Sequence, residues 1–122
     1  MTIDPQQLAD RYTALWNEPD PALRHAAIAG LWRPDGVHFV GTRVARGHPA
    51  LQERVAGSHE KNVRDAGRFF RARRDARALP GVVTFHWEMV EPATGAVLAV
   101  GLEFLQVDAE GRIAADYQFI VN

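Results

Sequence analysis

Residues 84–90 spell TFHWEMV and place two side chains that could move protons close together in the chain. If this segment is a β-strand, His86 and Glu88 share one face, while Phe85 and Trp87 share the other. A carboxylic acid beside a histidine is suited to general acid–base catalysis. The same two side chains could instead lie on the solvent-facing side of an ordinary half-buried strand. The residues alone leave both alternatives open.

Few other kinds of chemistry have support in the sequence. The chain has no cysteine, which excludes disulfides and thiolate catalysis. The stretch GTRVARG at 41–47 matches neither common phosphate-binding loop, and no serine lies in a nucleophile-elbow motif. A metal site would draw on His38, His59, His86 and Glu88, whose spacing matches none of the usual ligand motifs. We therefore expect neither a bound metal nor a cofactor.

Length and charge restrict the class of protein. The 122 residues fit a single domain spanning 1–122, and 47% apolar with 24% charged residues is ordinary for a globular protein. A net charge of −1 gives no general attraction to nucleic acid or to an anionic membrane. The first residues do not resemble a secretory signal, and no apolar run is long enough to span a bilayer. The expected location is therefore cytoplasmic.

The stretch RFFRARRDAR at 68–77 carries five arginines. It could bind an anionic partner, or it could be an exposed edge strand whose charges prevent aggregation. The overall charge favours the edge strand. Arg73 or Arg74 could still reach the mouth of a pocket and favour acidic ligands.

Three helices are predicted in the first half of the chain. Asp4–Pro5 and Asp20–Pro21 each combine a capping aspartate with a proline suited to the first turn. Apolar residues recur at helical spacing after both, so the first helix covers 4–17 and the second follows it. A third helix begins at His48–Pro49 and ends near Gly67.

After the third helix the sequence changes to the alternating pattern of strands. Predicted strands, including two short ones before the third helix, cover residues 37–40, 43–47, 68–79, 81–91, 95–108 and 112–121. The segment RPDG at 33–36 is predicted as a turn. Helices gathered ahead of long antiparallel strands indicate an α+β domain with the helices on one face of the sheet. A curved sheet closed by three helices would form a cone with a pocket inside.

Four stretches resemble the nuclear transport factor 2-like superfamily: DRYTALWNEPDPALRHAAIAGLW, DGVHFV, RGHPAL and GLEFLQVDAEGRI. The superfamily includes ketosteroid isomerases, SnoaL-like polyketide cyclases and non-catalytic binding proteins. The resemblance covers nearly the whole chain. It implies a cone-shaped barrel of three N-terminal helices on a curved, mainly antiparallel sheet, whereas the fold by itself does not specify a function.

The ketosteroid isomerase pattern can be placed on individual residues. The tyrosine that donates to the substrate oxyanion matches Tyr12, and the protonated carboxylic acid beside it matches Glu103. The general-base aspartate falls on Val40, which cannot accept a proton. His38, two residues earlier on the same face, is the candidate substitute, and His86 is a second candidate.

The resemblance also implies which side chains face the pocket. If Glu103 points inward, the other expected inward residues are His86, Glu88, Val90, Gly101, Leu105, Asp116 and Gln118. Three carboxyl groups in one low-dielectric cavity cannot all be ionised, so at least one pKa should be raised. Trp16, Val40 and Leu105 would supply apolar wall, and His59 could close the pocket from the third helix.

The expected function is a pocket for a small apolar organic molecule, with cofactor-free proton transfer such as isomerisation, cyclisation or dehydration. A non-catalytic ligand-binding, dimerising or protein-binding module is the alternative, and valine at position 40 favours it. A homodimer through the convex sheet face is expected. Its interface would contain Phe85, Trp87, Met89, Tyr117 and Phe119.

Overall fold

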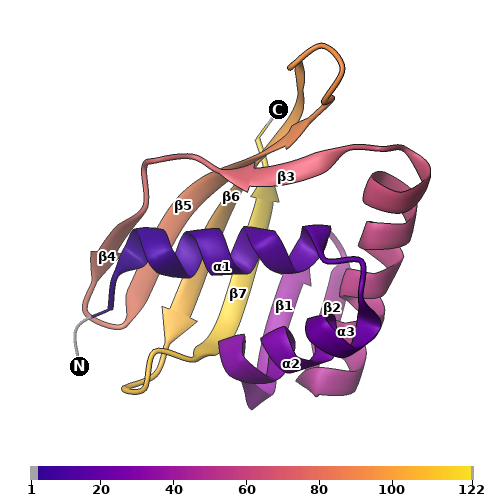
Figure 1. The fold of residues 1–122 in the computed structure, drawn as a ribbon. Helices are drawn as coiled ribbons and strands as arrows, with labels where there is room; N and C mark the ends of the chain where they lie inside the picture. Colours follow the sequence, from indigo (N-terminus) through magenta and orange to yellow (C-terminus); the bar gives the residue numbers. More distant parts are fainter. Residues whose placement is uncertain (1–2, 122) are drawn as a thin grey trace.

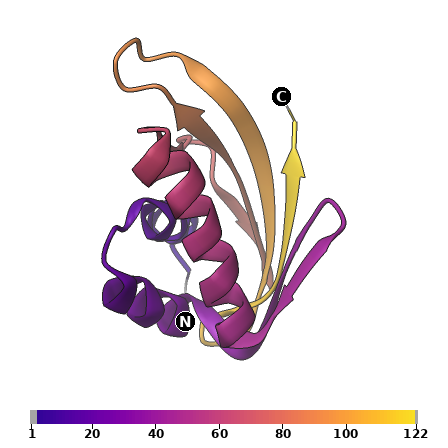
Figure 2. The ribbon, with the colours of Figure 1, turned by 90° about the vertical axis from the view of Figure 1, so that its right-hand side faces the viewer.

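The computed structural model describes residues 3–121, which form helices on one side of a curved sheet (Figures 1 and 2). The helices are α1 (Pro5–Asn17), α2 (Pro21–Leu31) and α3 (Gly47–Ser58), and α3 continues into a π-helix, η1 (His59–Asp65). The strands are β1 (Trp32–Val40), β2 (Arg43–Arg46), β3 (Phe69–Ala72), β4 (Arg77–Leu79), β5 (Val82–Val90), β6 (Val97–Val107) and β7 (Ile113–Ile120). No helix among the described residues is long and apolar enough to cross a membrane.

The first two helices begin where the sequence predicts. The Asp4 side chain accepts a hydrogen bond from the backbone N–H of Gln7 at 3.1 Å, and Asp20 accepts one from Ala22 at 2.9 Å. Each bond satisfies an N–H group that has no partner inside the helix. In both helices the residue after the aspartate is a proline at the first helical position.

The strands form one sheet in the order β2-β1-β7-β6-β5-β3, with β4 also paired to β5. All neighbours are antiparallel except β1 and β7, which are parallel. The two ends of this order do not pair, so the sheet is curved but open. The predicted α+β architecture, with helices on a mainly antiparallel sheet, is confirmed.

Two predicted element boundaries are wrong. Residues 33–36 are not a separate turn but the start of β1, where the pairing with β7 shifts register between Trp32 and Val37. The predicted strand 68–79 is split into β3 and β4. Between them, Asp75 accepts a hydrogen bond from the backbone N–H of His86 at 3.1 Å, so the chain leaves the ladder to place this side chain.

The predicted facing of β5 is also wrong. Phe85 pairs with Glu103 and Trp87 with Gly101, so Phe85 and Trp87 lie on the inner, helix-covered face with Glu103. Phe85 is 1% exposed and Trp87 is 8% exposed. His86 and Glu88 therefore occupy the outer face.

The outer-face residues of β5 are held by ion pairs. Glu88 accepts from Arg71 at 2.9 Å and from Arg73 at 3.0 Å, while His86 Nδ1 contacts Asp75 at 2.6 Å. These contacts satisfy the hydrogen-bonding groups of His86 and Glu88 on the outer face, outside the pocket. Arg73 is occupied in the same way and does not reach the pocket mouth.

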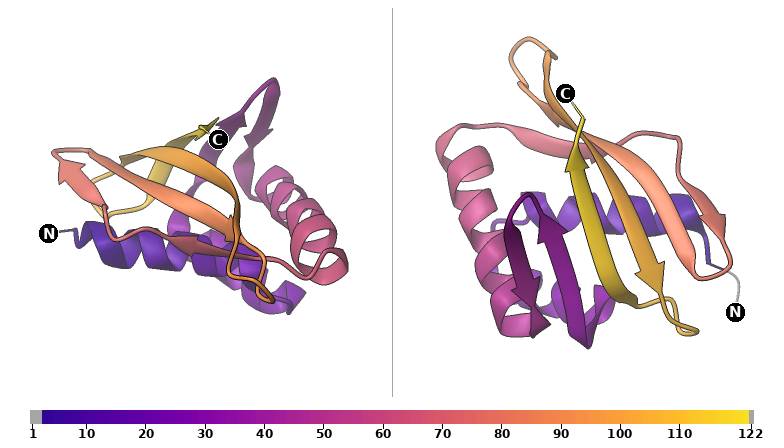
Figure 3. Two further views of the ribbon diagram at one scale, coloured as in Figure 1. Left: turned by 90° about the horizontal axis from the view of Figure 1, so that it is seen from above. Right: turned by 180° about the vertical axis from the view of Figure 1, so that it is seen from behind.

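The outer face of the sheet is left uncovered by the helices (Figure 3). Its centre carries a row of aromatic rings: Phe39 stacks on Tyr117 at 5.0 Å between ring centroids, and Phe104 meets Tyr117 edge-on at 6.2 Å. Phe119 extends the row and is 56% exposed. Of the residues predicted for a dimer interface, Tyr117 and Phe119 face outward. Phe85, Trp87 and Met89 belong to the inner face, where they pack in or against the core.

Candidate active site

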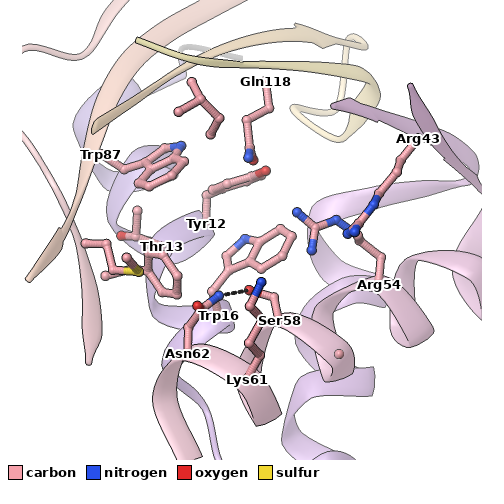
Figure 4. Close-up of a pocket in the computed structure, with 14 residues that line it drawn as sticks. Tyr12, Thr13, Trp16, Arg43, Arg54, Ser58, Lys61, Asn62, Trp87 and Gln118 are labelled. Atoms are coloured by element: carbon pink, nitrogen blue, oxygen red, sulfur yellow. Dashed lines mark hydrogen bonds between the residues drawn. The ribbon is translucent and has the colours of Figure 1, made fainter. Parts of the chain in front are cut away.

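A pocket of about 430 Å³ lies on the inner face of the sheet, bounded by α1, α3 and η1 (Figure 4). Its wall combines aromatic and aliphatic side chains with three cations. The lining residues are Tyr12, Thr13, Trp16, Arg43, Arg54, Gly57, Ser58, Lys61, Asn62, Phe70, Trp87, Met89, Gln118 and Ile120.

Helical spacing explains which residues form the two helical walls. Tyr12 and Trp16 are four residues apart in α1, so they share one face, and their ring centroids are 6.0 Å apart. Arg54 and Ser58 present the same spacing from α3. The wall formed by α3 continues into η1, where the Asn62 side chain donates to Ser58 Oγ at 3.2 Å.

Behind the pocket, a chain of hydrogen bonds joins two buried carboxyl groups. Asp116 Oδ2 accepts from the Tyr12 hydroxyl at 2.6 Å and contacts His38 Nδ1 at 2.7 Å. The Tyr12 hydroxyl lies 3.3 Å from Glu103 Oε2, and the Trp87 indole N–H donates to Glu103 Oε1 at 2.8 Å. Glu103 and Asp116 have no exposed surface, and His38 is 1% exposed.

Strand register brings these groups together. His38 and Asp116 are directly opposite each other in the parallel β1–β7 pair. Glu103 pairs with Gln118 in the β6–β7 ladder, two positions from Asp116 and on the same face. Tyr12 then reaches down from α1, which crosses this part of the sheet (Figure 1). The residues with proton-transfer chemistry thus come from four elements.

The two carboxyl groups differ in protonation. Burial raises the pKa of Glu103 well above its ordinary value, and the charge of Asp116 raises it further, so Glu103 is a neutral carboxylic acid. Burial alone would also raise the pKa of Asp116. Attraction to His38 and hydrogen bonds from Glu103, His38 and Tyr12 outweigh burial and lower that pKa, so Asp116 is the carboxylate. The expectation that at least one carboxyl pKa is raised agrees with Glu103.

Tyr12 remains a neutral phenol. Burial, followed by the charge of Asp116, raises its pKa well above the ordinary value. Its single hydrogen lies on the shorter contact, toward Asp116. Tyr12 is therefore a donor to the carboxylate in this arrangement.

His38 has one nitrogen bonded and one free. Nδ1 is held by Asp116, whereas Nε2 is buried and has no hydrogen-bond partner within residues 3–121. His38 lines a second cavity of about 440 Å³, which shares Arg43, Arg54, Gly57 and Ser58 with the pocket. An imidazole fixed through one nitrogen by a carboxylate can accept or donate a proton at the other.

The structure brings together some of the sequence-predicted residues and separates others. Tyr12, Trp16 and Gln118 line the pocket, while His38, Glu103 and Asp116 form the buried chain next to it. His86 and Glu88 are on the outer face, so their predicted place in the pocket is wrong. The other three predicted ligand-binding residues, Val40, His59 and Leu105, do not line the pocket.

Each of these three has another environment. His59 is buried, and its Nδ1 contacts the backbone carbonyl of Trp16 at 3.1 Å. Leu105 is fully buried in the core, and Val40 is half-buried at the end of β1.

The pocket residues that the sequence did not reveal include three cations, Arg43, Arg54 and Lys61. Arg54, Ser58 and Lys61 recur at intervals of four and three residues, which is the spacing of one helical face. The sequence therefore contains the pattern of one helical face. It does not indicate a pocket, because charged residues on a helix normally face solvent.

His38, Glu103 and Asp116 also offer three ligand atoms within 4.8 Å of one another, as a metal site would. However, two nitrogen or oxygen atoms on a tetrahedral zinc ion would lie roughly 3.4 Å apart. His38 Nδ1 and Asp116 Oδ2 are 2.7 Å apart, which is a hydrogen-bond distance. The donor set thus fits a proton relay better than a metal centre.

Comparison with known proteins supports the fold. No protein-family model and no curated protein matches the sequence. Among solved structures, a candidate isomerase of the SnoaL-like family from Agrobacterium tumefaciens superposes with a TM-score of 0.86 at 20% identity, covering 97% of both chains.

Two further structures show the same architecture. An NTF2-like protein of unknown function from Exiguobacterium has a TM-score of 0.71 at 16% identity, covering 94% of this chain and 98% of its own. A candidate polyketide cyclase from Sinorhizobium meliloti has a TM-score of 0.66 at 11% identity, covering 93% of this chain and 94% of its own. The chain therefore has the NTF2-like, SnoaL-like fold that its sequence resembles.

Proposed function

We propose that this protein binds a small organic molecule in the pocket and transfers a proton on it, with His38 as the proton carrier. One observation carries the proposal: a buried histidine is fixed by a buried carboxylate at 2.7 Å, and its other nitrogen is left without a partner. A buried polar atom without a hydrogen-bond partner destabilises the folded protein, so its presence calls for a functional reason. The solved isomerase and cyclase candidates of the same fold are consistent with this reaction class.

The reaction needs only the residues of the chain. With Nδ1–H donated to Asp116, the lone pair of His38 lies on Nε2, which can remove a proton from a carbon next to a carbonyl group. The C–H electron pair becomes the C=C bond of an enolate, and the imidazolium is stabilised by Asp116. Return of the proton to a different atom of the substrate completes an isomerisation.

Tyr12 and Glu103 are proposed here as positioning residues. Both were expected to donate to the substrate oxyanion, but the Tyr12 hydroxyl is directed to Asp116, and Glu103 does not line the pocket. Their hydrogen bonds fix the orientation of Asp116, and Asp116 in turn fixes His38.

Substrate must approach His38 from the cavity on the far side of Arg54. The Arg54 side chain lies in the wall common to the pocket and the second cavity. Displacement of this side chain by a ligand would join the two spaces and give the ligand access to the cavity that His38 lines. We propose that binding and exposure of the base are coupled in this way.

Replacing His38 with glutamine should abolish proton transfer. The measurement is deuterium incorporation from D₂O, followed by NMR, into a panel of enolisable ketones and 2-oxo acids that fit the pocket. We expect wild-type protein to accelerate exchange for some of the panel, and the variant to lose about 100-fold or more.

His86→Gln is the matched control for this experiment. His86 is also bonded to an aspartate, at 2.6 Å, but on the outer face. It should retain wild-type exchange rates. Equal rates for His38→Gln and wild type, or no acceleration on any compound, would exclude the proposed reaction.

A non-catalytic ligand-binding function is the second candidate. It is favoured by the buried position of His38 Nε2 and by Val40 at the position where ketosteroid isomerases carry their base. Saturable binding of panel compounds without exchange would establish this alternative.

We also propose that the protein forms a homodimer through the outer face of the sheet. The aromatic row of Phe39, Phe104, Tyr117 and Phe119 supports this, since an apolar patch of this kind is uncommon on a monomer. Sedimentation should show a dimer for wild type and a monomer for Phe119→Lys. Leu23→Lys changes a residue that is 54% exposed on α2, on the helical side of the sheet, and should stay dimeric. A monomeric wild-type protein would contradict the proposal.

A further inference from the structure

The pocket carries positive charge that is not paired directly with any carboxylate of the described residues. Arg43, Arg54 and Lys61 line it, whereas no aspartate or glutamate does. Within residues 3–121, none of the three forms an ion pair. The second cavity adds one acidic residue, Glu53, which also makes no ion pair with Arg43 or Arg54.

Five arginines outside the pocket are paired with carboxylates on the surface. Arg33 pairs with Asp35, Arg64 with Asp65, Arg71 and Arg73 with Glu88, and Arg74 with Asp10. No such partner lines the pocket. Its guanidinium and ammonium groups are therefore available to a bound anion.

Arg54 is the central member of the group. Its guanidinium carbon lies 5.1 Å from the centroid of the Trp16 ring, and its Nε is buried without a hydrogen-bond partner among the described residues. Figure 4 shows Arg43 and Arg54 extending toward Trp16 and Tyr12 from the same side of the pocket. Burial lowers the pKa of Arg54 and the charge of Arg43 lowers it further, while the charge of Asp116 behind the pocket opposes this shift.

A partly buried guanidinium next to a second cation is unfavourable unless an anion joins them. Arginine presents a planar set of N–H donors that matches a carboxylate through two parallel hydrogen bonds. The remaining walls, formed by Trp16, Phe70, Trp87, Met89 and Ile120, suit an apolar body.

We infer that the ligand of this pocket is an organic acid, with an aromatic or other apolar body and a carboxylate bound by Arg54 and Arg43. This inference refines the expected small apolar ligand and rests on the proposed function only in using the same pocket. The sequence suggested that Arg73 or Arg74 could favour acidic ligands. The inference assigns that preference to Arg43 and Arg54 instead. Lys61, from η1, adds a third positive charge at the rim.

Binding of paired probes tests the inference without requiring turnover. The probes are 3-phenylpropanoate, its uncharged amide, and 2-phenylethyl phosphate, together with the corresponding naphthyl series for a larger body. We expect calorimetry or ligand-observed NMR to show each carboxylate binding at least about tenfold more tightly than its amide. The phosphate ester should bind more weakly than the carboxylate.

Variants assign the preference to particular side chains. Arg54→Gln and Arg43→Gln should each reduce the ratio of carboxylate to amide affinity about tenfold. Arg46→Gln is the matched control, because Arg46 lies on the same strand as Arg43 but three residues away, on the opposite face. It removes the same charge and should leave the ratio unchanged. Arg43 is exposed, so its variant remains informative if Arg54→Gln does not fold.

The possible results separate the inference from the proposed function. If the acid preference persists in His38→Gln while exchange is absent from every variant, the ligand class stands and the proposed reaction fails. Equal affinity for acid and amide, tighter binding of the phosphate ester, no binding by any probe, or an unchanged ratio in Arg43→Gln and Arg54→Gln would overturn the inference.

Discussion

Replacing Gly101 with alanine should lower the free energy of unfolding by about 3 kcal/mol. A Cβ atom at this position would lie 2.1 Å from two atoms of the Trp87 indole. Trp87 is directly opposite Gly101 on the neighbouring strand and is almost completely buried, so the ring cannot move aside freely. Displacing it would also break the 2.8 Å hydrogen bond to Glu103. Urea denaturation monitored by circular dichroism measures the effect.

Two further variants show whether the indole is the cause. Gly57→Ala adds the same methyl group where nothing lies within 4 Å, in α3, and should stabilise the protein by up to about 1 kcal/mol. Gly101→Ala combined with Trp87→Leu should be more stable than the sum of the two single changes implies. A Gly101→Ala variant as stable as wild type would show that Trp87 does not occupy this position.

The Glu103→Gln variant should become more stable than wild type as the pH is raised. Glutamine resembles a protonated glutamic acid, so it can still accept from the Trp87 indole and donate on its other side. The fold should remain intact. Because Glu103 helps to position Asp116, ligand binding or turnover should weaken.

The direction of the pH effect follows from the raised pKa of Glu103. Below the unfolded value, near 4.3, both the folded and unfolded chains carry the proton. Above it, the unfolded chain loses the proton while the folded chain retains it. The stability of wild type then falls by up to about 1.4 kcal/mol per pH unit, until Glu103 ionises in the folded state. The variant has no such loss.

Asp116 and Tyr12, which share the hydrogen-bonded chain with Glu103, titrate outside this window. The lowered pKa of Asp116 contributes stability that is lost as the pH falls below about 4, and it does so in both proteins. Tyr12 matters only above about pH 10. Urea unfolding of both proteins between pH 4 and pH 9 should therefore show a difference that widens with pH. A constant difference would mean that Glu103 is already ionised in the folded protein.

Features determined by neighbouring residues were predictable from the sequence. The caps at Asp4 and Asp20 depend on bonds to residues two or three positions away, so the local pattern contains all that is needed. The inward facing of Glu103, Asp116 and Gln118 was also predicted correctly, from the family resemblance.

The facing of β5 was not predictable in the same way. Which residues of one strand lie opposite those of the next depends on the turn between them and on the shift in register near Val90. The apolar stripe of Phe85 and Trp87 indicated the core side correctly by itself. The resemblance reversed that assignment because it transferred an assumed register. Burial of large aromatic surfaces decides the question in the folded protein.

The candidate site was predicted in part for a related reason. Carboxylates and histidines on strands were found because the sheet pattern assigned their faces. Arg54 was missed because its helical stripe looks like an ordinary solvent-facing one, and only the packing of α3 against distant residues turns that stripe toward the pocket. Its stacking on Trp16 unites residues 38 positions apart in the chain.

The parallel pairing of β1 with β7 affects when the protein becomes functional during folding. His38 and Asp116 are 78 residues apart and meet only when the last strand docks beside the first. Closing so long a loop is entropically costly, and contacts of this range slow folding. The contact between His38 and Asp116 would therefore be among the last to form. Partly folded chains would lack the proposed proton carrier even with their helices in place, and the imidazole resonances of His38 would report completion of the fold.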